Sequence, residues 1–265
     1  MSRLQHQIEV RVSRGETAFI PYIMAGDGGL SALRERLQFL EQAGATAVEL
    51  GIPFSDPVAD GPVIQEAGLR ALAAGTTLRG VLEEVASFKE ELSIPLVIMT
   101  YYNPVVQLEL TTFAQLAEAA GIAGVIVPDV PLEESEELKA ALNDVSIDLI
   151  QLVSLTSPAE RIGRIAEASQ GFVYAVTVNG ITGTRQSLPD EVFTHLKALK
   201  AVSPVPVMAG FGVSLPEHIE QLGAVVDGVI VGSYVVDAFQ KGAEDTILPL
   251  IGQALARKDR LAVNK

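Results

Sequence analysis

Short runs of apolar residues recur through this chain, separated by polar segments, at intervals of roughly 20 to 50 residues. Val, Ile and Leu dominate the runs, which are continuous rather than alternating with polar residues. A continuous run is typical of a strand buried on both faces of a parallel sheet. The runs predict eight strands, at residues 17–23, 45–50, 94–102, 122–129, 147–153, 171–178, 205–210 and 227–233.

Segments with helical apolar spacing lie between most of these strands. Examples are the leucines at positions 30, 33, 37 and 40, and the apolar residues at 113, 116, 117 and 120. Glycine precedes several strands, where a left-handed cap would end the preceding helix. These glycines are Gly44, Gly121, Gly171 and Gly223. The repeating unit is therefore a strand followed by a helix.

Eight such units in one chain of 265 residues predict an α/β fold, the (β/α)₈ TIM barrel. We expect a single domain over residues 1–265, with an extra N-terminal helix and additional short helices, one of them at 77–88. An open, doubly wound sheet is the alternative.

Composition narrows the functional classes. The chain is 48% hydrophobic, which supplies a large core, and its formal net charge of −14 disfavours nucleic acid and anionic membranes as partners. It has no cysteine, no apolar run of membrane-spanning length and no apolar leader segment at its start. We therefore expect a soluble, cytoplasmic protein in which any anionic ligand is held locally.

Glu49 lies inside an apolar run and requires an explanation. It could point into solvent at the end of its strand, or be buried against a neighbouring amide. Strand parity offers a third possibility, because if Ala47, Glu49 and Gly51 face the barrel axis, then Val48 and Leu50 pack against the helices. An apolar setting raises the pKa of a carboxyl group, which suits it to give and take a proton near neutral pH.

Two aspartates follow in a long loop. Asp56 and Asp60 stand in sequences typical of turns and helix starts, with Pro62 suited to a first helical turn. The loops after the strands nevertheless carry the active site in a barrel, and this loop directly follows the strand of Glu49. A functional role for either aspartate therefore stays open.

Glycine-rich segments after the seventh and eighth strands predict a phosphate site. Residues 210–214 read GFGVS, and a short helix is expected to start near Ser233. Backbone N–H groups and a helix N-terminus bind phosphate without needing a lysine. The segment 179–184, NGITGT, adds exposed amides on a loop that could close. A simple tight turn is the alternative explanation for each glycine alone.

Other candidate groups are less informative. The histidines at positions 6, 195 and 218 have no metal-ligand spacing and are expected on the surface, so no metal site is predicted. Aromatic residues at 22, 101, 102, 174 and 211 lie in strands or at strand ends, where they would pack in the core or line a flat aromatic ligand.

Seven motifs together resemble the tryptophan synthase alpha subunit family along nearly the whole chain. They are FIPYIMAGD (19–27), VELGIPFSDPVADGPVIQ (48–65), MTYYNP (99–104), GVIVPDVPLEES (124–135), GFVYAVTVNGITGTR (171–185), MAGFGVS (208–214) and VDGVIVGS (226–233). The resemblance implies a lyase that cleaves indole-3-glycerol phosphate to indole and glyceraldehyde 3-phosphate in tryptophan biosynthesis.

The resemblance also implies roles for individual residues. Glu49 would be the acid and base, Asp60 would stabilise positive charge on the indole nitrogen, and Tyr174 would lie close to Glu49. The phosphate positions would be Gly183, Gly212, Val213, Gly232 and Ser233. The indole pocket would be Tyr22, Met99, Tyr101, Ile126, Leu152 and Phe211, with Tyr22 where many members have phenylalanine. Thr182 would bond Asp60 when its loop closes.

A partner is implied as well. The family forms an alpha-beta-beta-alpha heterotetramer with a beta subunit that carries pyridoxal phosphate, whereas this chain would hold no cofactor of its own. Pro53, Asp56, Pro57 and the turn around Asn103 would lie near that interface. The alternatives are a free-standing lyase that releases indole to solution, a catalytically silent barrel that only activates a partner, and a phosphate-binding isomerase or epimerase.

Overall fold

The computed structural model describes residues 1–154, 157–176, 189–210 and 212–256. Within these residues eight parallel strands close into a barrel, each strand pairing with its sequence neighbours and β8 pairing with β1. The strands are β1 (Ala18–Met24), β2 (Val48–Gly51), β3 (Leu96–Met99), β4 (Ile122–Ile126), β5 (Asp148–Ser154), β6 (Val173–Val176), β7 (Val207–Gly210) and β8 (Gly228–Val231). Closure confirms the predicted TIM barrel and excludes the open sheet.

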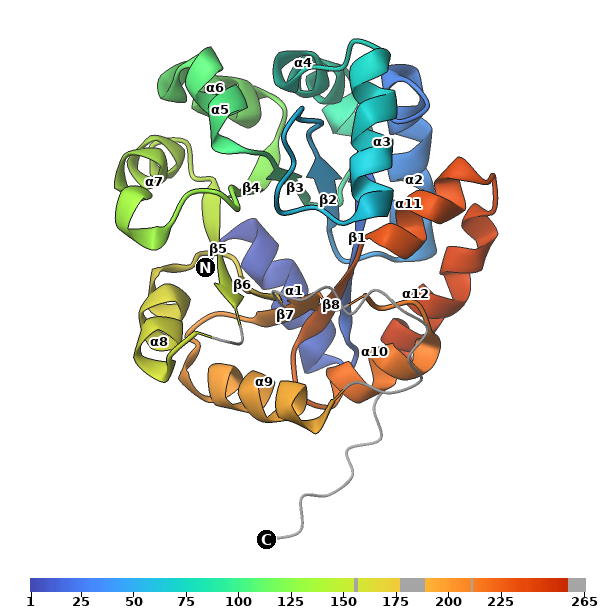
Figure 1. Cartoon of the computed structure of the whole chain (residues 1–265). Helices are drawn as coiled ribbons and strands as arrows, with labels where there is room; N and C mark the ends of the chain where they lie inside the picture. The colour runs from blue at the N-terminus through green and yellow to red at the C-terminus, as the bar shows by residue number, and fades with distance from the viewer. Residues whose placement is uncertain (155–156, 177–188, 211, 257–265) are drawn as a thin grey trace, which may run out of the picture.

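Twelve α-helices in the described ranges surround the barrel or cover its ends (Figure 1). They are α1 (Arg3–Ser13), α2 (Leu33–Ala43), α3 (Pro62–Ala73), α4 (Leu78–Phe88), α5 (Tyr102–Leu108), α6 (Leu110–Ala119), α7 (Glu136–Asn143), α8 (Ala159–Ala168), α9 (Asp190–Val202), α10 (Pro216–Gly223), α11 (Ser233–Gln240) and α12 (Leu248–Leu255). The extra N-terminal helix α1, the helix α4 and the start of α11 match the prediction.

Short 3₁₀ turns occupy four further segments of the described chain. They are η1 (Leu30–Ala32), η2 (Lys89–Glu91), η3 (Leu132–Glu134) and η4 (Glu244–Ile247). The tetrapeptide YYNP, expected as a turn, instead begins helix α5, whose first N–H group, on Tyr102, is bound by the Asp129 carboxylate at 3.0 Å. A carboxylate at a helix start stabilises that end of the helix dipole.

Two apolar layers divide the core. The inner layer fills the barrel axis and includes Ala18, Ala47 and Val97, together with Leu4 and Ile8 of α1. The outer layer, which includes Val48 and Leu50, packs between the strands and the surrounding helices. The two layers confirm the predicted parity of β2 and place α1 as a plug at the amino ends of the strands.

Two expectations about individual residues are wrong. Gly223 does not end its helix in the left-handed conformation, because it is the last residue of α10 and the chain continues through Ala224 at φ −69°. His218 is buried rather than solvated, because α10 turns it inward, where its Nδ1 atom is 3.4 Å from the Ser214 N–H nitrogen. The glycines at 44, 121 and 171 do have positive φ, as predicted.

Candidate active site

Glu49 points from β2 into the barrel. Only 1% of the Glu49 surface is exposed. In the barrel, Glu49 is aligned with Tyr22 on β1 and with Val97 on β3. Neither carboxyl oxygen has a hydrogen-bond partner among the described residues. Burial, and then the negative charge of Asp60, raise the pKa of Glu49 to about 8. Glu49 is therefore mostly protonated at neutral pH, as an acid catalyst requires.

Asp60 is the second carboxyl group of the site. It stands at the end of the connection from β2 to α3, half-buried, and burial raises the pKa of Asp60 to about 6 against a lowering hydrogen bond from Tyr101. Its backbone is held on both sides, since its N–H donates to the Pro57 carbonyl at 3.1 Å and its carbonyl accepts from Gln65 Nε2 at 2.9 Å. Asp60 is thus mostly ionised where Glu49 is mostly neutral.

Tyr101, at the end of β3, fastens the loop that carries Asp60. Its ring stacks on Phe54 with centroids 5.0 Å apart, and its hydroxyl accepts the Ala59 N–H at 2.9 Å. One buried side chain therefore contacts both the start and the end of the loop. The sequence predicted Tyr101 as a wall of the pocket, and the structure adds this contact with the loop.

Two further tyrosines lie near the same carboxyl groups. Burial raises the pKa of Tyr22 well above its ordinary value, with Asp60 and Glu49 adding to the effect. Burial likewise raises the pKa of Tyr174, with Glu49 and then Asp60 contributing. Mutual electrostatic influence of this kind requires short distances. The four predicted polar groups, Tyr22, Glu49, Asp60 and Tyr174, are therefore brought together in one site.

Apolar side chains line the same end of the barrel. Met99, Ile126 and Leu152 belong to the inner layer, and Met99 also packs with Tyr22 under α3. Register aligns Met99 with Ile126, and Leu152 with Tyr174, on adjacent strands. Met99, Ile126 and Leu152 thus place apolar side chains on three neighbouring strands at this end of the barrel, which suits a flat, uncharged ring. Phe211, predicted for the same wall, lies outside the described residues.

The predicted phosphate positions are partly described. Gly212 adopts φ +65°, and Val213 behind it is buried. Gly232 is the N-cap residue of α11 and packs beside Tyr22, because a Cβ at residue 232 would be 3.7 Å from the tyrosine Cβ. The N–H groups of the first turn of α11, from Ser233 on, have no carbonyl one turn earlier. Gly183 and Thr182 lie outside the described residues.

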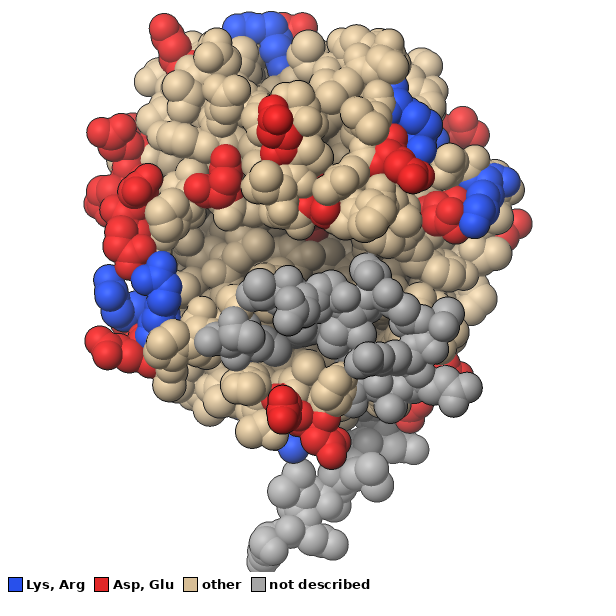
Figure 2. Space-filling model, viewed as in Figure 1, with Lys and Arg blue, Asp and Glu red and all other residues tan. Residues whose placement is uncertain are grey.

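The carboxyl face of the barrel is hollowed across its middle (Figure 2). The Lys and Arg side chains drawn in colour lie at the edges of this face, away from the hollow. A phosphate bound here by the described residues would rely on backbone N–H groups and the start of α11 rather than on a basic side chain.

The residues predicted near a partner have different exposures. Asp56 and Asn103 are exposed, Pro57 is half-buried and Pro53 is buried. Val58, directly after Pro57, is apolar, yet 85% of its surface is exposed. Val58 thus presents an apolar side chain at the tip of the loop that carries Asp60.

Sequence reasoning missed the residues that hold this loop. Phe54 contacts Tyr101, and Gln65 contacts the Asp60 carbonyl. Both lie within the motif at 48–65, but neither was given a role from the sequence. Their roles depend on how the loop folds back over β3, which no local pattern encodes. The loop itself was marked as functional by its length, by its place after the strand of Glu49 and by the motif that covers it.

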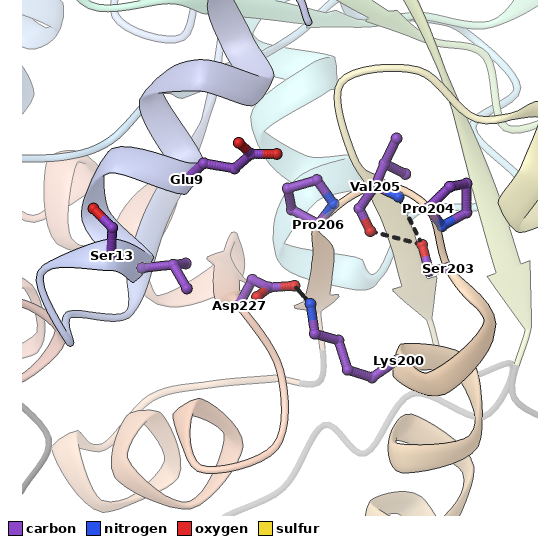
Figure 3. Close-up of a pocket in the computed structure, with 9 residues that line it drawn as sticks. Glu9, Ser13, Lys200, Ser203, Pro204, Val205, Pro206 and Asp227 are labelled. Carbon is purple, nitrogen blue, oxygen red and sulfur yellow. Dashed lines mark hydrogen bonds and ion pairs between the residues drawn. The ribbon is translucent and has the colours of Figure 1, made fainter. Parts of the chain in front are cut away.

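A separate pocket of about 330 Å³ lies at the opposite end of the barrel, between α1 and the segment that leads into β7 (Figure 3). Asp227 lines it, accepting from Lys200 Nζ at 2.5 Å and from the Val207 N–H at 2.7 Å. These bonds join α9, β7 and the residue before β8. The amino end of a barrel serves stability, and we assign the pocket no role in chemistry. The described residues contain no group of three or more His, Asp or Glu side chains placed to hold a metal ion.

The fold and the site define a class. A (β/α)₈ barrel with a protonated glutamate inside it, an ionised aspartate beside it and an apolar wall is suited to general acid–base catalysis on a flat substrate.

Comparison with known proteins identifies the family. The family model described as tryptophan synthase alpha chain matches residues 9–258. The tryptophan synthase alpha chain of Oceanobacillus iheyensis is 49% identical over 257 residues, which cover 97% of this chain and 98% of that protein. The alpha chain of Bacillus anthracis is 47% identical over 253 residues, covering 96% and 98%. The chain therefore belongs to the tryptophan synthase alpha chain family.

Solved structures agree. Tryptophan synthase from Mycobacterium tuberculosis matches with a TM-score of 0.88 and 34% identity over 97% of this chain and 99% of that chain. A structure described as the tryptophan synthase a2b2 complex from Pyrococcus furiosus matches with a TM-score of 0.82 and 37% identity over 91% and 97%. These relatives confirm the resemblance, and with it a lyase enzyme, and they favour an alpha subunit over a free-standing lyase.

Proposed function

We propose that this chain cleaves indole-3-glycerol phosphate to indole and glyceraldehyde 3-phosphate, with Glu49 as the acid and base and Asp60 as the electrostatic partner. The observation that carries the proposal is the Glu49 carboxyl group, buried inside the barrel without a hydrogen-bond partner among the described residues. An unpartnered buried carboxyl group costs stability. A catalytic role gives that cost a purpose.

The proton balance closes on Glu49 alone. The protonated carboxyl group donates its proton to C3 of the indole ring, which loses its aromaticity and leaves positive charge on the ring nitrogen. The resulting carboxylate then takes the proton of the hydroxyl group next to the ring. The C3–carbon bond breaks, its electron pair restores the indole ring, and the hydroxyl carbon becomes the aldehyde. Glu49 ends protonated, ready for another turnover.

Asp60 supports the middle of this sequence. A carboxylate placed opposite the indole N–H stabilises the positive charge that develops there. A pKa of about 6 for Asp60 and about 8 for Glu49 keeps the first ionised and the second neutral near pH 7. Two carboxyl groups with separated pKa values define an acid and a stabiliser. Tyr174, beside Glu49, would help orient the carboxyl group.

The remaining assignments follow the same geometry. Met99, Tyr101, Ile126, Leu152 and Tyr22 would hold the indole ring, joined by Phe211. Gly212, Val213, Gly232 and Ser233 would bind the phosphate through backbone N–H groups, joined by Gly183, and Thr182 would bond Asp60 on loop closure. The reaction needs no organic cofactor on this chain, because Glu49 gives one proton to the ring carbon and regains another from the substrate hydroxyl.

A beta subunit is the proposed partner, in an alpha-beta-beta-alpha assembly in which that subunit carries pyridoxal phosphate. The a2b2 description of the Pyrococcus furiosus relative supports this assembly. Exposed Val58, which follows Asp56 and Pro57, offers the partner an apolar contact on the loop that holds Asp60, and Asn103 is exposed as well. No helix in the described ranges has the length and apolar character needed to cross a membrane. A cytoplasmic location is part of the proposal and fits a chain without cysteine.

A steady-state assay of indole release tests the function. The full chain is given indole-3-glycerol phosphate alone and with a beta subunit. We expect indole and glyceraldehyde 3-phosphate in equal amounts, at a rate that rises when the beta subunit is added. The absence of both products under both conditions would refute the activity. A high rate that the partner leaves unchanged would favour a free-standing lyase.

A further inference from the structure

Helix α3 begins two residues after Asp60 and packs against the carboxyl end of β1. Its buried positions are Ile64, Ala67, Gly68 and Ala71, and they pack on Tyr22 and Met24 of β1 and on Val236 of α11. Three of these four residues have small side chains or none. A contact surface of small residues interlocks weakly, so apolar packing alone fixes the height of the helix over the barrel better than its rotation or sliding.

A directional contact supplies what the packing lacks. Arg70, on α3, donates from Nε to Asp27 Oδ1 at 2.7 Å and from Nη2 to Asp27 Oδ2 at 2.8 Å. Asp27 lies in the loop after β1 and is 6% exposed. A bidentate pair between a planar guanidinium and a carboxylate fixes both distance and orientation. The pair therefore sets where α3 sits along and around its own axis.

The surroundings of the pair are also constrained. Gly26, at φ +82°, brings the backbone of the β1 loop so close to Thr76 that a Cβ at residue 26 would be 1.9 Å from Thr76 Oγ1. The Arg36 guanidinium stacks on the Phe239 ring at 5.1 Å and adds a second positive charge near Asp27. The loop after β1 thus presents a closely packed, charged contact to α3.

We propose that Arg70 and Asp27 are positioning residues for Asp60, through the bidentate pair that fixes α3 on the β1 loop. The inference rests on the proposed function, because it assigns these residues to that same site. Asp60 precedes the first residue of α3 by two positions, and Arg70 lies about 12 Å further along the helix at 1.5 Å per residue. Rotation or sliding of α3 is therefore transmitted to the Asp60 carboxylate. A displacement of about 1 Å in a catalytic group costs on the order of 100-fold in rate.

A double-mutant cycle on the full chain with its beta subunit separates positioning from general stability. Arg70→Met should lower kcat for indole release by about 10- to 100-fold while changing KM by less than about threefold. In an Asp60→Asn background, the same change should cost less than about twofold, because the group it positions is already disabled. An equal loss in both backgrounds would overturn the proposal.

Two further variants guard against a folding defect. Arg70→Lys keeps the charge but cannot form the bidentate pair, and Asp27→Asn keeps the shape but not the charge. Both should lose kcat in the same sense as Arg70→Met, with circular dichroism spectra that match the wild type. If both folded variants retain the wild-type rate, the proposal is wrong.

Arg161 provides a matched control. It forms a bidentate pair with Glu133 at 2.9 and 3.1 Å on the exposed surface of α8. Arg161→Met should leave kcat and KM unchanged, and a loss equal to that of Arg70→Met would count against a specific role. The lyase function and the positioning role can fail separately. A wild-type chain that releases no indole would overturn both proposals. An active wild type with an equally active Arg70→Met variant would overturn only the positioning role.

Discussion

The hydroxyl oxygen of Tyr22 lies directly over Gly51, where a Cβ atom at residue 51 would be only 1.8 Å away. Gly51 is two residues beyond Glu49 on β2, and Tyr22, on the neighbouring strand β1, is aligned with Glu49. The absence of a side chain at Gly51 therefore leaves room for the phenol ring beside the carboxyl group that we propose as catalytic. The same contact thus fixes the residue type at position 51 and the place of the Tyr22 ring.

Gly51→Ala should damage both stability and activity. The added methyl group overlaps the buried ring of Tyr22, so we expect a loss of about 1–3 kcal/mol in the free energy of unfolding. Denaturant unfolding measures the loss, and indole release should fall with it. Gly163→Ala is the control, because nothing lies within 4 Å of its Cβ position in helix α8. That variant should be as stable as the wild type or up to about 1 kcal/mol more stable.

The rate should depend on pH as a bell-shaped curve. The free enzyme needs Asp60 ionised and Glu49 protonated, so kcat/KM should fall below about pH 6 and above about pH 8. A profile of indole release from pH 5 to pH 9 measures both limbs. A rate that keeps rising above pH 8 would contradict the assignment of Glu49 as the acid.

Tyr101→Phe should move only the acid limb of that profile. The hydrogen bond from Tyr101 lowers the pKa of Asp60. Its removal should raise the pKa of Asp60, and the acid limb should shift to higher pH while the basic limb stays in place. An acid limb that does not move would show that Tyr101 has no influence on Asp60 in solution.

Glu49 should also shape the pH dependence of stability. Its pKa is about 8 in the folded chain against 4.5 for a free glutamate. Between these two pKa values, the folded state holds a proton that the unfolded state releases. The free energy of unfolding should therefore fall as the pH rises from about 4.5 to 8. Glutamine does not titrate, so Glu49→Gln removes this decrease. Relative to the wild type, the free energy of unfolding of the variant should rise by a few kcal/mol across that range, at about 1.4 kcal/mol per pKa unit. Unfolding curves of both proteins at pH 5 and pH 8 test this, and a constant difference would contradict it.

Val58 should contribute to binding the beta subunit. Burying a valine side chain in an interface contributes about 1.5–3 kcal/mol, so Val58→Ser should weaken association about tenfold or more. Titration calorimetry measures the Kd. Val202, which is 54% exposed at the end of α9, is the matched control, and Val202→Ser should leave the Kd unchanged. If Val58→Ser and Val202→Ser bind the beta subunit with the same Kd, Val58 does not contribute to the interface.

The barrel could be predicted from sequence because each strand is a continuous apolar run, and continuous runs have few other solutions than a covered parallel sheet. Strand parity placed Ala47, Glu49 and Gly51 on one face and Val48 and Leu50 on the other, and so offered an inward Glu49 as one of three possibilities. The structure decides among them, because Ala47 lies in the inner layer and Val48 in the outer layer.

Contacts between distant segments could not be predicted in the same way. The stacking of Phe54 on Tyr101 and the pairing of Arg70 with Asp27 join residues more than forty positions apart, through loops whose paths no periodicity encodes. His218 was misjudged for a related reason, because a histidine near a helix start gives no sign of which side of the helix faces the core. Side-chain burial there depends on how α10 is rotated against the barrel.

Glu49→Gln gives the most direct test of the central claim, that one buried carboxyl group moves the proton. Single-turnover and steady-state indole release are measured for the wild type and the variant with saturating indole-3-glycerol phosphate and the beta subunit. The amide keeps the shape and loses the proton, so turnover should fall at least about 1000-fold while substrate affinity stays within about threefold. A folded Glu49→Gln variant that retains a tenth of the wild-type rate would contradict the account.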